Sequence, residues 1–144
     1  MKVYLDNCCY NRPFDDQGGI LIRIETEAKL FVQYEIHAGR IELAWSSMND
    51  YENNDNPSLE KTERIAVWRD MAKDVVTMND AIFESALEFE RIGLKPKDAI
   101  HIASAIAAHC DVFLTTDKRI LNKPITKIRV LNPVSFLEVY QNEK

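Results

Sequence analysis

The stretch Leu-Lys-Pro-Lys-Asp-Ala-Ile-His-Ile-Ala-Ser-Ala at residues 94–105, followed by Val-Phe-Leu-Thr-Thr-Asp at residues 112–117, decides the fold of this chain. Pro96 marks the start of a helix whose body, through Ala108, is apolar on nearly every side. Such a helix is expected to be buried in the middle of the domain. The apolar run at 112–115 predicts a strand directly after it.

Strand and helix patterns alternate along the rest of the chain. Gly39 and Gly93 are expected to end two of the helices. Because parallel strands need crossover connections, the alternation predicts an α/β fold with a central parallel sheet covered on both faces. The predicted strands are 3–5, 41–45, 75–78, 112–115 and 128–131. The predicted helices are about 21–37, a segment from about 58, one capped by Asn79, the buried helix from Pro96, and a short C-terminal helix after Asn132-Pro133.

Composition and charge limit the class of protein. With 144 residues, 46% of them hydrophobic, the chain is expected to form a single domain spanning residues 1–144. We expect no signal peptide and no membrane span. Three cysteines without a CxxC spacing favour a reducing, cytoplasmic location and disfavour zinc. The net charge of −5 argues against a general polyanion binder.

Four acids lie where a predicted strand ends or a helix begins. They are Asp6, Glu52, Asp98 and Asp117. Ligands bind parallel α/β sheets at the carboxyl ends of the strands, so these acids are expected to converge on one site. Glu52 is the weaker member, because it lies some residues beyond the second strand on a polar segment that could begin a helix.

Gathering carboxylates is costly, because two unit charges ~5 Å apart at an effective dielectric of ~20 repel by roughly 3 kcal/mol. A divalent cation relieves this repulsion, and an all-oxygen donor set favours Mg²⁺ or Mn²⁺ acting on a phosphodiester. Basic residues follow or flank the acids and could contact phosphates, or could be ordinary surface charge. They are Arg12, Lys95, Lys97, Lys118 and Arg119.

Each acid also has a purely structural interpretation. Asp98 could stabilise the start of its helix, Asp6 could form an Asx turn with Asn7, and Asp117 could cap a short helix through Ile120. His101 faces the same way as Ala105 and is interpreted as a core residue rather than a catalytic base. The metal-site hypothesis therefore rests on the convergence of the acids.

Three segments together resemble PIN-domain proteins: Val-Tyr-Leu-Asp-Asn at residues 3–7, the helix at 94–105 and the strand with its Thr-Thr-Asp sequel at 112–117. The order and spacing match across essentially the whole chain. The resemblance implies a three-layer α/β/α sandwich and a ribonuclease dependent on Mg²⁺ or Mn²⁺. Many small stand-alone members are VapC-like toxins of toxin/antitoxin pairs.

The resemblance also implies roles for individual residues. Asp6, Asp98 and Asp117 would hold the metal, and Glu52 would ligate through water or accept a proton. The supporting hydroxyl matches Thr116, and Thr115 less well. Asn7 and Arg12 are further supporting candidates. Lys118, Arg119 and Ile120 stand where many members carry another acid, which disfavours a second tightly bound metal.

The implied partners are an RNA substrate, a cognate antitoxin whose tail enters the acidic cleft, and a second copy of the chain in a homodimer. Phe31, Tyr34 and Trp68 are candidates for an antitoxin groove. The segment 11–14 differs from the commonest toxins, so the RNA target could differ as well. Two alternatives stay open: an interaction module of the same fold without catalysis, and a metal-dependent phosphatase, which the absence of an Asp-x-Asp pair makes weaker.

Overall fold

Five short strands form one parallel sheet at the centre of the computed structural model, which describes residues 1–143. The strand order is β3-β2-β1-β4-β5, so β1 is central, and Tyr4 of β1 pairs with Ala44 of β2 and Phe113 of β4. The predicted α/β fold with a central parallel sheet is confirmed. The strands are β1 (Lys2–Leu5), β2 (Glu42–Ser46), β3 (Asp74–Val76), β4 (Val112–Leu114) and β5 (Arg129–Leu131).

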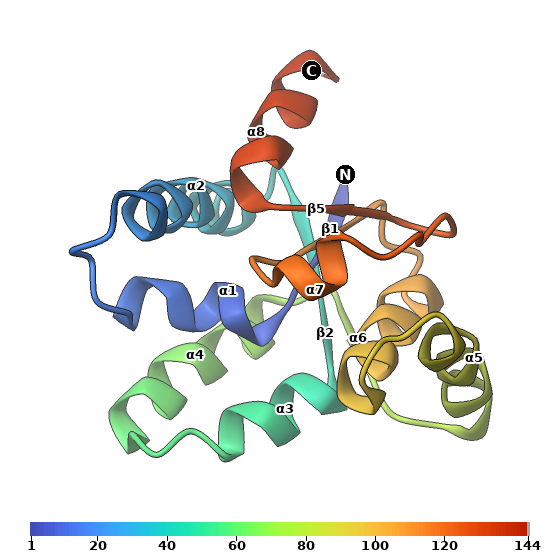
Figure 1. Cartoon of the computed structure of the whole chain (residues 1–144). Coiled ribbons are helices and arrows are strands. Elements are labelled where there is room, and N and C mark those ends of the chain that lie inside the picture. Colours follow the sequence, from blue (N-terminus) through green and yellow to red (C-terminus); the bar gives the residue numbers. More distant parts are fainter. Residues whose placement is uncertain (144) are drawn as a thin grey trace.

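Helices cover both faces of this sheet and form the two outer layers of the three-layer α/β/α sandwich (Figure 1). They are α1 (Asn7–Asn11), the 3₁₀ helix η1 (Arg12–Phe14), α2 (Ile20–His37), α3 (Ser47–Asn54), α4 (Leu59–Met71), α5 (Asp80–Arg91), α6 (Pro96–Ala107), α7 (Lys118–Leu121) and α8 (Pro133–Asn142). Gly39 and Gly93 follow the ends of α2 and α5 with φ of 79° and 102°, the left-handed conformation that glycine adopts at low cost. Both predicted helix stops are confirmed.

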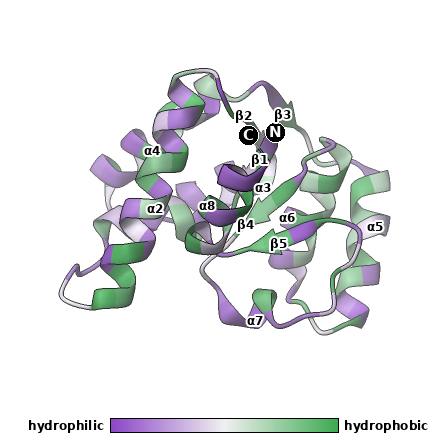
Figure 2. Ribbon diagram, turned by 90° about the horizontal axis from the view of Figure 1, so that it is seen from above, coloured by the Kyte–Doolittle hydropathy of each residue, from purple (hydrophilic) through white to green (hydrophobic). Residues whose placement is uncertain are grey.

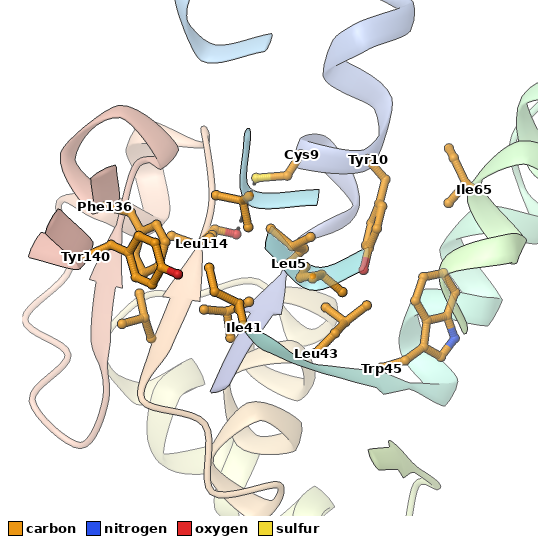
Figure 3. Packing of buried hydrophobic residues seen from close by; sticks show 14 residues of the cluster. Leu5, Cys9, Tyr10, Ile41, Leu43, Trp45, Ile65, Leu114, Phe136 and Tyr140 are labelled. Atoms are coloured by element: carbon orange, nitrogen blue, oxygen red, sulfur yellow. Dashed lines mark hydrogen bonds between the residues drawn. The ribbon is translucent and has the colours of Figure 1, made fainter. Parts of the chain in front are cut away.

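Side chains of the central strands point alternately to the two faces of the sheet, and each face has its own hydrophobic core. On one face, Val3 and Leu5 pack with residues of α1, α2, α4 and α8 (Figure 3). On the other face, Tyr4 and Phe113 stack at a ring-centroid distance of 5.3 Å and pack against α5 and α6. Each large side chain buried in this way contributes about 1.5–3 kcal/mol, so the strands are fixed between the two helical layers.

The structure differs from the sequence predictions in several places. Helix α1 was not predicted, the segment after β2 is a helix from its first residue, and β3 begins and ends earlier than predicted. Several large apolar residues of the helices are exposed to solvent: Ile24, Phe31, Met71, Phe83 and Leu87. The apolar pattern correctly predicted that these segments are helices. Which side of each helix faces the core depends on the neighbouring elements, which the pattern does not show.

Among residues 1–143, no helix is long and apolar enough to cross a lipid bilayer.

Candidate functional site

Asp6 lies at the centre of the carboxyl edge of the sheet. It directly follows β1, the central strand, and its backbone N–H donates to the carbonyl of Leu114 at the end of β4 at 2.9 Å. Asp6 is the N-cap residue of α1, yet its side chain makes no capping hydrogen bond. Asp6 is only 6% exposed, so its carboxylate is enclosed by neighbouring side chains.

A threonine hydroxyl fixes the Asp6 carboxylate. Thr115 Oγ1 donates to Asp6 Oδ2 at 2.8 Å, and the same hydroxyl accepts the backbone N–H of Asp117 at 3.0 Å. Thr116 was predicted ahead of Thr115 as the supporting hydroxyl, but the hydroxyl that hydrogen-bonds Asp6 in the structure is that of Thr115. Within residues 1–143 the Thr116 hydroxyl has no side-chain hydrogen bond to Asp6, and its backbone N–H points to Cys8 Sγ at 3.3 Å.

Glu52 reaches the site from the second turn of α3. The capping box of Ser46 and Asn49 starts this helix at the end of β2, which places the following turns over the sheet edge. The Glu52 carboxylate hydrogen-bonds His101 Nε2, and that nitrogen lies 3.9 Å from Asp6 Oδ1. One ligand atom from each of Asp6, Glu52 and His101 lies within 4.8 Å of the other two, so the three side chains form one tight cluster.

His101 belongs to a buried polar network beneath the cluster. The Tyr4 hydroxyl lies 2.5 Å from both Ser46 Oγ and His101 Nδ1, so β1, β2 and α6 are joined at this point. Burial of the Tyr4 ring raises the pKa of its hydroxyl well above the usual value. The expectation that His101 packs in the core agrees with its full burial, but its outer nitrogen also orients Glu52.

Asp98 extends from the first turn of α6, one helical turn before His101. It is half-buried, and burial is the largest cause that raises the pKa of its carboxyl to about 6. The negative charges of Asp6, Asp117 and Glu52 raise the pKa further, while His101 lowers it. A carboxylate senses charge only at short range, so the four acids share one electrostatic environment.

Replacing Asp98 by asparagine should therefore stabilise the metal-free protein by about 1–2 kcal/mol at pH 7.5. Because folding raises this pKa, the folded state of the wild-type protein binds more protons between pH 4 and pH 6, and its stability falls as pH rises through that window. Asp98→Asn should lack this decline. Urea unfolding in EDTA measures the difference.

Asp80→Asn is the matched control for that experiment, because Asp80 also lies in the first turn of a helix but is exposed. Losing its charge there should cost a few tenths of a kcal/mol through the helix dipole, which is the opposite sign. Equal effects of the two substitutions would contradict the shared electrostatic environment of the acids.

Asp117 follows β4 and caps α7, as its structural interpretation predicted. Its Oδ1 accepts the backbone N–H of Arg119 at 2.9 Å, and its Oδ2 accepts Arg119 Nη2 at 2.9 Å. This contact is the main cause that holds the pKa of the Asp117 carboxyl below its usual range. Arg119 is largely exposed, so it can leave Asp117 when another cation binds there.

An open cleft of about 470 Å³ lies beside the acids. Its lining combines acids with cations: Glu52, Lys95, Pro96, Lys97, Asp98 and Arg119. At its rim, Lys97 Nζ lies 5.1 Å from the centroid of the exposed Tyr51 ring. Positive charge thus surrounds a negative centre, which is the arrangement expected for a phosphodiester bound next to a metal ion.

Two further predicted supporting residues are engaged elsewhere. Asn7 is buried and accepts the Asn49 side-chain amide at 2.7 Å, which holds α1 against α3. Arg12 pairs with Asp15 at 2.9 Å and with Glu25 at 3.3 Å, so its charge is balanced within the protein. The structure places neither side chain in the lining of the cleft.

Sequence analysis missed Cys8 as a neighbour of the acids. Its Sγ donates to Asp6 Oδ2 at 3.3 Å and lies 3.4 Å from Thr115 Oγ1. The signal that could have found it is local: α1 starts directly after Asp6, and the second residue of a helix points back toward its start. The thiol makes the Asp6 surroundings less polar than a site built from oxygen alone.

The donor set fits a divalent cation. Oxygens of Asp6 and Glu52 are close together, and the pKa of Asp98 is raised in part by uncompensated negative charge nearby. A cation at this point would relieve that repulsion. Carboxylate oxygens suit Mg²⁺ or Mn²⁺, while the His101 nitrogen would favour a transition metal over Mg²⁺.

Comparisons with known proteins identify the family and the fold of this chain. Residues 23–125 match the family model described as PIN domain. No curated protein has a significantly similar sequence. Solved structures with the same fold include three that span nearly the whole chain.

The first is VapBC2 from Rickettsia felis, bound to a DNA fragment from its promoter: 15% identity, TM-score 0.56, covering 92% of this chain and 98% of that one. The second is FitAcB from Neisseria gonorrhoeae: 11% identity, TM-score 0.58, covering 91% and 97%. The third is VapBC-1 from nontypeable Haemophilus influenzae: 14% identity, TM-score 0.60, covering 92% and 98%.

Proposed function

Because the chain belongs to the PIN domain family, we propose that it is an endoribonuclease that depends on Mg²⁺ or Mn²⁺ and hydrolyses RNA phosphodiester bonds. The observation that carries the proposal is the clustering of Asp6, Glu52 and His101 within 4.8 Å, with the raised pKa of Asp98 beside them. A site that only stabilised the fold would avoid this concentration of negative charge. A site that binds a cation requires such a concentration of negative charge.

Each side chain of the site has its own proposed role in hydrolysis. Asp6, Asp98 and Asp117 would hold the cation, which when bound supplies positive charge that acidifies the attacking water and stabilises the phosphate oxygens. Glu52 would accept the proton of that water. The hydrogen bond from His101 supports this role because it orients the Glu52 carboxylate. Arg119, released from Asp117, would contact the phosphate.

RNA as the substrate is supported by the rim of the cleft. Lys95 and Lys97 provide charge for a sugar-phosphate backbone, and the exposed Tyr51 ring offers a face on which a base can stack. Single-stranded RNA presents unstacked bases for such contacts. The proposal includes a cytoplasmic location, which is supported by three cysteines that form no disulfide among the described residues.

The first experiment is incubation of a mixed RNA pool with the purified protein and Mn²⁺ or Mg²⁺, with EDTA and Asp98→Asn as controls. Cleavage that both controls abolish is the expected result. No cleavage together with no Mn²⁺ binding by calorimetry would contradict the proposal and favour an interaction module of the same fold.

Removing the Thr115 hydroxyl is a second test, and the neighbouring Thr116 provides the matched control. Thr115→Val removes the hydrogen bonds to Asp6 and Asp117, so cleavage should fall roughly 10- to 100-fold. Thr116→Val, the same change one residue later, should stay within about threefold, since its hydroxyl does not hold a site carboxylate. Comparable losses in both variants would contradict the assignment of Thr115. Initial rates on one RNA measure both.

A role as the toxin of a type II toxin/antitoxin pair is part of the proposal. The structural neighbours include proteins named VapBC. Helix α2, whose ribbon carries hydrophobic stretches in Figure 2, exposes large apolar side chains that a partner would cover. They are Ile20, Leu21, Ile24, Phe31 and Tyr34. Co-purification with the product of an adjacent small gene, and a dimer mass by light scattering, are the expected results.

A further inference from the structure

A second, smaller cavity lies between α1, η1, α2 and α4, and we call it the α2/α4 pocket. It has a volume of about 160 Å³, and its lining includes Tyr10, Phe14, Lys29, Gln33, Arg64 and Trp68. It shares no lining residue with the acidic cleft. Figure 3 shows Tyr10 extending from α1 toward Ile65 of α4 and Trp45 of β2. The proposed RNA cleavage makes no use of this pocket.

Lys29 is the unusual residue of the pocket. Its side chain is 3% exposed, and its Nζ lies over the Tyr10 ring at 5.5 Å from the centroid. Within residues 1–143 no carboxylate forms an ion pair with it. The two buried acids of the same helix pair elsewhere, Glu25 with Arg12 and Glu35 with Arg40. A buried ammonium without a counter-charge is costly, so its retention needs a reason.

Two more polar groups of the pocket lack partners. Gln33 Nε2 and the Tyr10 hydroxyl are buried, and neither has a hydrogen-bond partner among the described residues. Gln33 lies one helical turn after Lys29, so both side chains emerge on the same face of α2. Three of the residues that line this small cavity therefore carry a donor group that bonds to no acceptor among the described residues. Buried unsatisfied groups are rare enough to require an explanation.

We propose that the α2/α4 pocket is a binding site for a carboxylate. One carboxylate brings the missing negative charge for Lys29 and two oxygens that accept from Gln33 and Tyr10. The pocket holds roughly five waters at ~30 Å³ each, which fits a carboxyl group with a few carbon atoms and excludes a nucleotide. The rings of Phe14 and Trp68 supply apolar contact for those carbons.

Carboxylate chemistry fits this pocket better than phosphate. A phosphate presents more charge and more oxygens than the three donors can satisfy, and the aromatic walls would have to desolvate it. Arg64, the other cation of the lining, is already paired with Glu60 at 2.9 Å. The carboxylate comes either from a free organic acid or from an acidic side chain of a partner peptide, and the two sources are separable by experiment.

The test is a ¹H–¹⁵N NMR titration of the whole chain with sodium benzoate, with uncharged benzamide as the matched probe. We expect saturable shifts of the Trp68 indole N–H and the Gln33 side-chain amide with benzoate and not with benzamide. Lys29→Met should weaken benzoate binding roughly tenfold or more, as expected for loss of a charge-assisted hydrogen bond. Lys118→Met, at an exposed lysine, should leave it unchanged.

A second experiment distinguishes the two possible sources of the carboxylate, a free organic acid and an acidic side chain of a partner peptide. Acetyl-Ala-Glu-Ala-amide is compared with its Gln counterpart and with free benzoate. Tighter binding of the Glu peptide supports an acidic side chain of a partner, and tighter binding of benzoate supports a free acid. The proposal is overturned if no carboxylate probe saturates at tens of millimolar, if Lys29→Met binds as well as the wild-type protein, or if inorganic phosphate binds as well as benzoate.

Discussion

Replacing Lys29 by methionine is expected to raise the free energy of unfolding by about 4 kcal/mol at pH 7 and below in the absence of ligand. Burial lowers the pKa of this amine from 10.5 to about 7, so holding it protonated in the folded state carries a penalty of that order. Methionine has a similar length and no charge. The lost contact with the Tyr10 ring offsets the gain by about 1 kcal/mol.

The stabilisation expected from Lys29→Met depends on pH, because the Lys29 amine loses its proton at a lower pH in the folded protein than in the unfolded chain. Folding lowers the pKa, so between pH 7 and pH 10.5 the unfolded chain binds the proton that the folded protein has released. The stability of the wild-type protein should therefore rise with pH across this window as far as Lys29 contributes. The advantage of Lys29→Met should shrink over the same range and vanish near its upper end.

Urea unfolding at several pH values measures this difference directly. Lys118→Met is the matched control, because the same substitution at an exposed lysine should change stability by no more than about 0.5 kcal/mol. A Lys29→Met protein no more stable than wild type at pH 7, or a gain that persists unchanged at pH 10, would show that the buried amine is satisfied in some other way. A residue kept at such a cost is typical of a functional site.

Helix α2 shows why its packing could not be predicted from sequence. Its sequence pattern correctly predicted a helix but did not show which side of the helix is buried, and the large apolar residues Ile24 and Phe31 are exposed. The buried side of the helix instead includes the polar residues Glu25, Lys29 and Gln33, spaced four apart. These residues face α1 and η1, and helix α1 is too short and polar to be marked by periodicity. A buried polar stripe therefore looks like a solvated face until its neighbours are known.

The candidate site was more predictable because strand ends are easy to locate. Asp6 and Asp117 follow apolar runs, and Asp98 follows a Pro that starts a helix, so the sheet rule brings all three to one edge. Thr115 and Thr116 are adjacent, and the sequence does not show which of two neighbouring side chains points to Asp6. His101 and Cys8 contact the acids through tertiary packing, which no spacing along the chain encodes.

Asp6→Asn is expected to reduce RNA cleavage at least 100-fold while leaving the protein folded, and this is the largest functional effect that we predict. Asp6 is the central acid, contacted by Thr115 and close to Glu52, and substitutions of groups that only support a metal ligand already cost 10- to 100-fold. Asparagine keeps the shape and an oxygen that can accept from Thr115. It removes the charge that a cation would bind.

A readout that does not depend on catalysis accompanies this variant. The charge of Asp6 is the second cause, after burial, that raises the pKa of Asp98 to about 6, so Asp6→Asn should lower that pKa. NMR titration of the Asp98 carboxyl in metal-free protein measures the shift. Calorimetry should show weaker Mn²⁺ binding by the same sample.

Asp55→Asn is the control for the Asp6 variant, because Asp55 lies on the exposed rim of the neighbouring hollow that Glu52 also lines. Losing a rim charge should change cleavage by no more than about threefold, through the local field alone. A folded Asp6→Asn protein that keeps more than a tenth of wild-type cleavage would refute the metal site. Loss of cleavage with Mn²⁺ affinity and the Asp98 pKa both unchanged would show that Asp6 acts on the substrate and not on the cation.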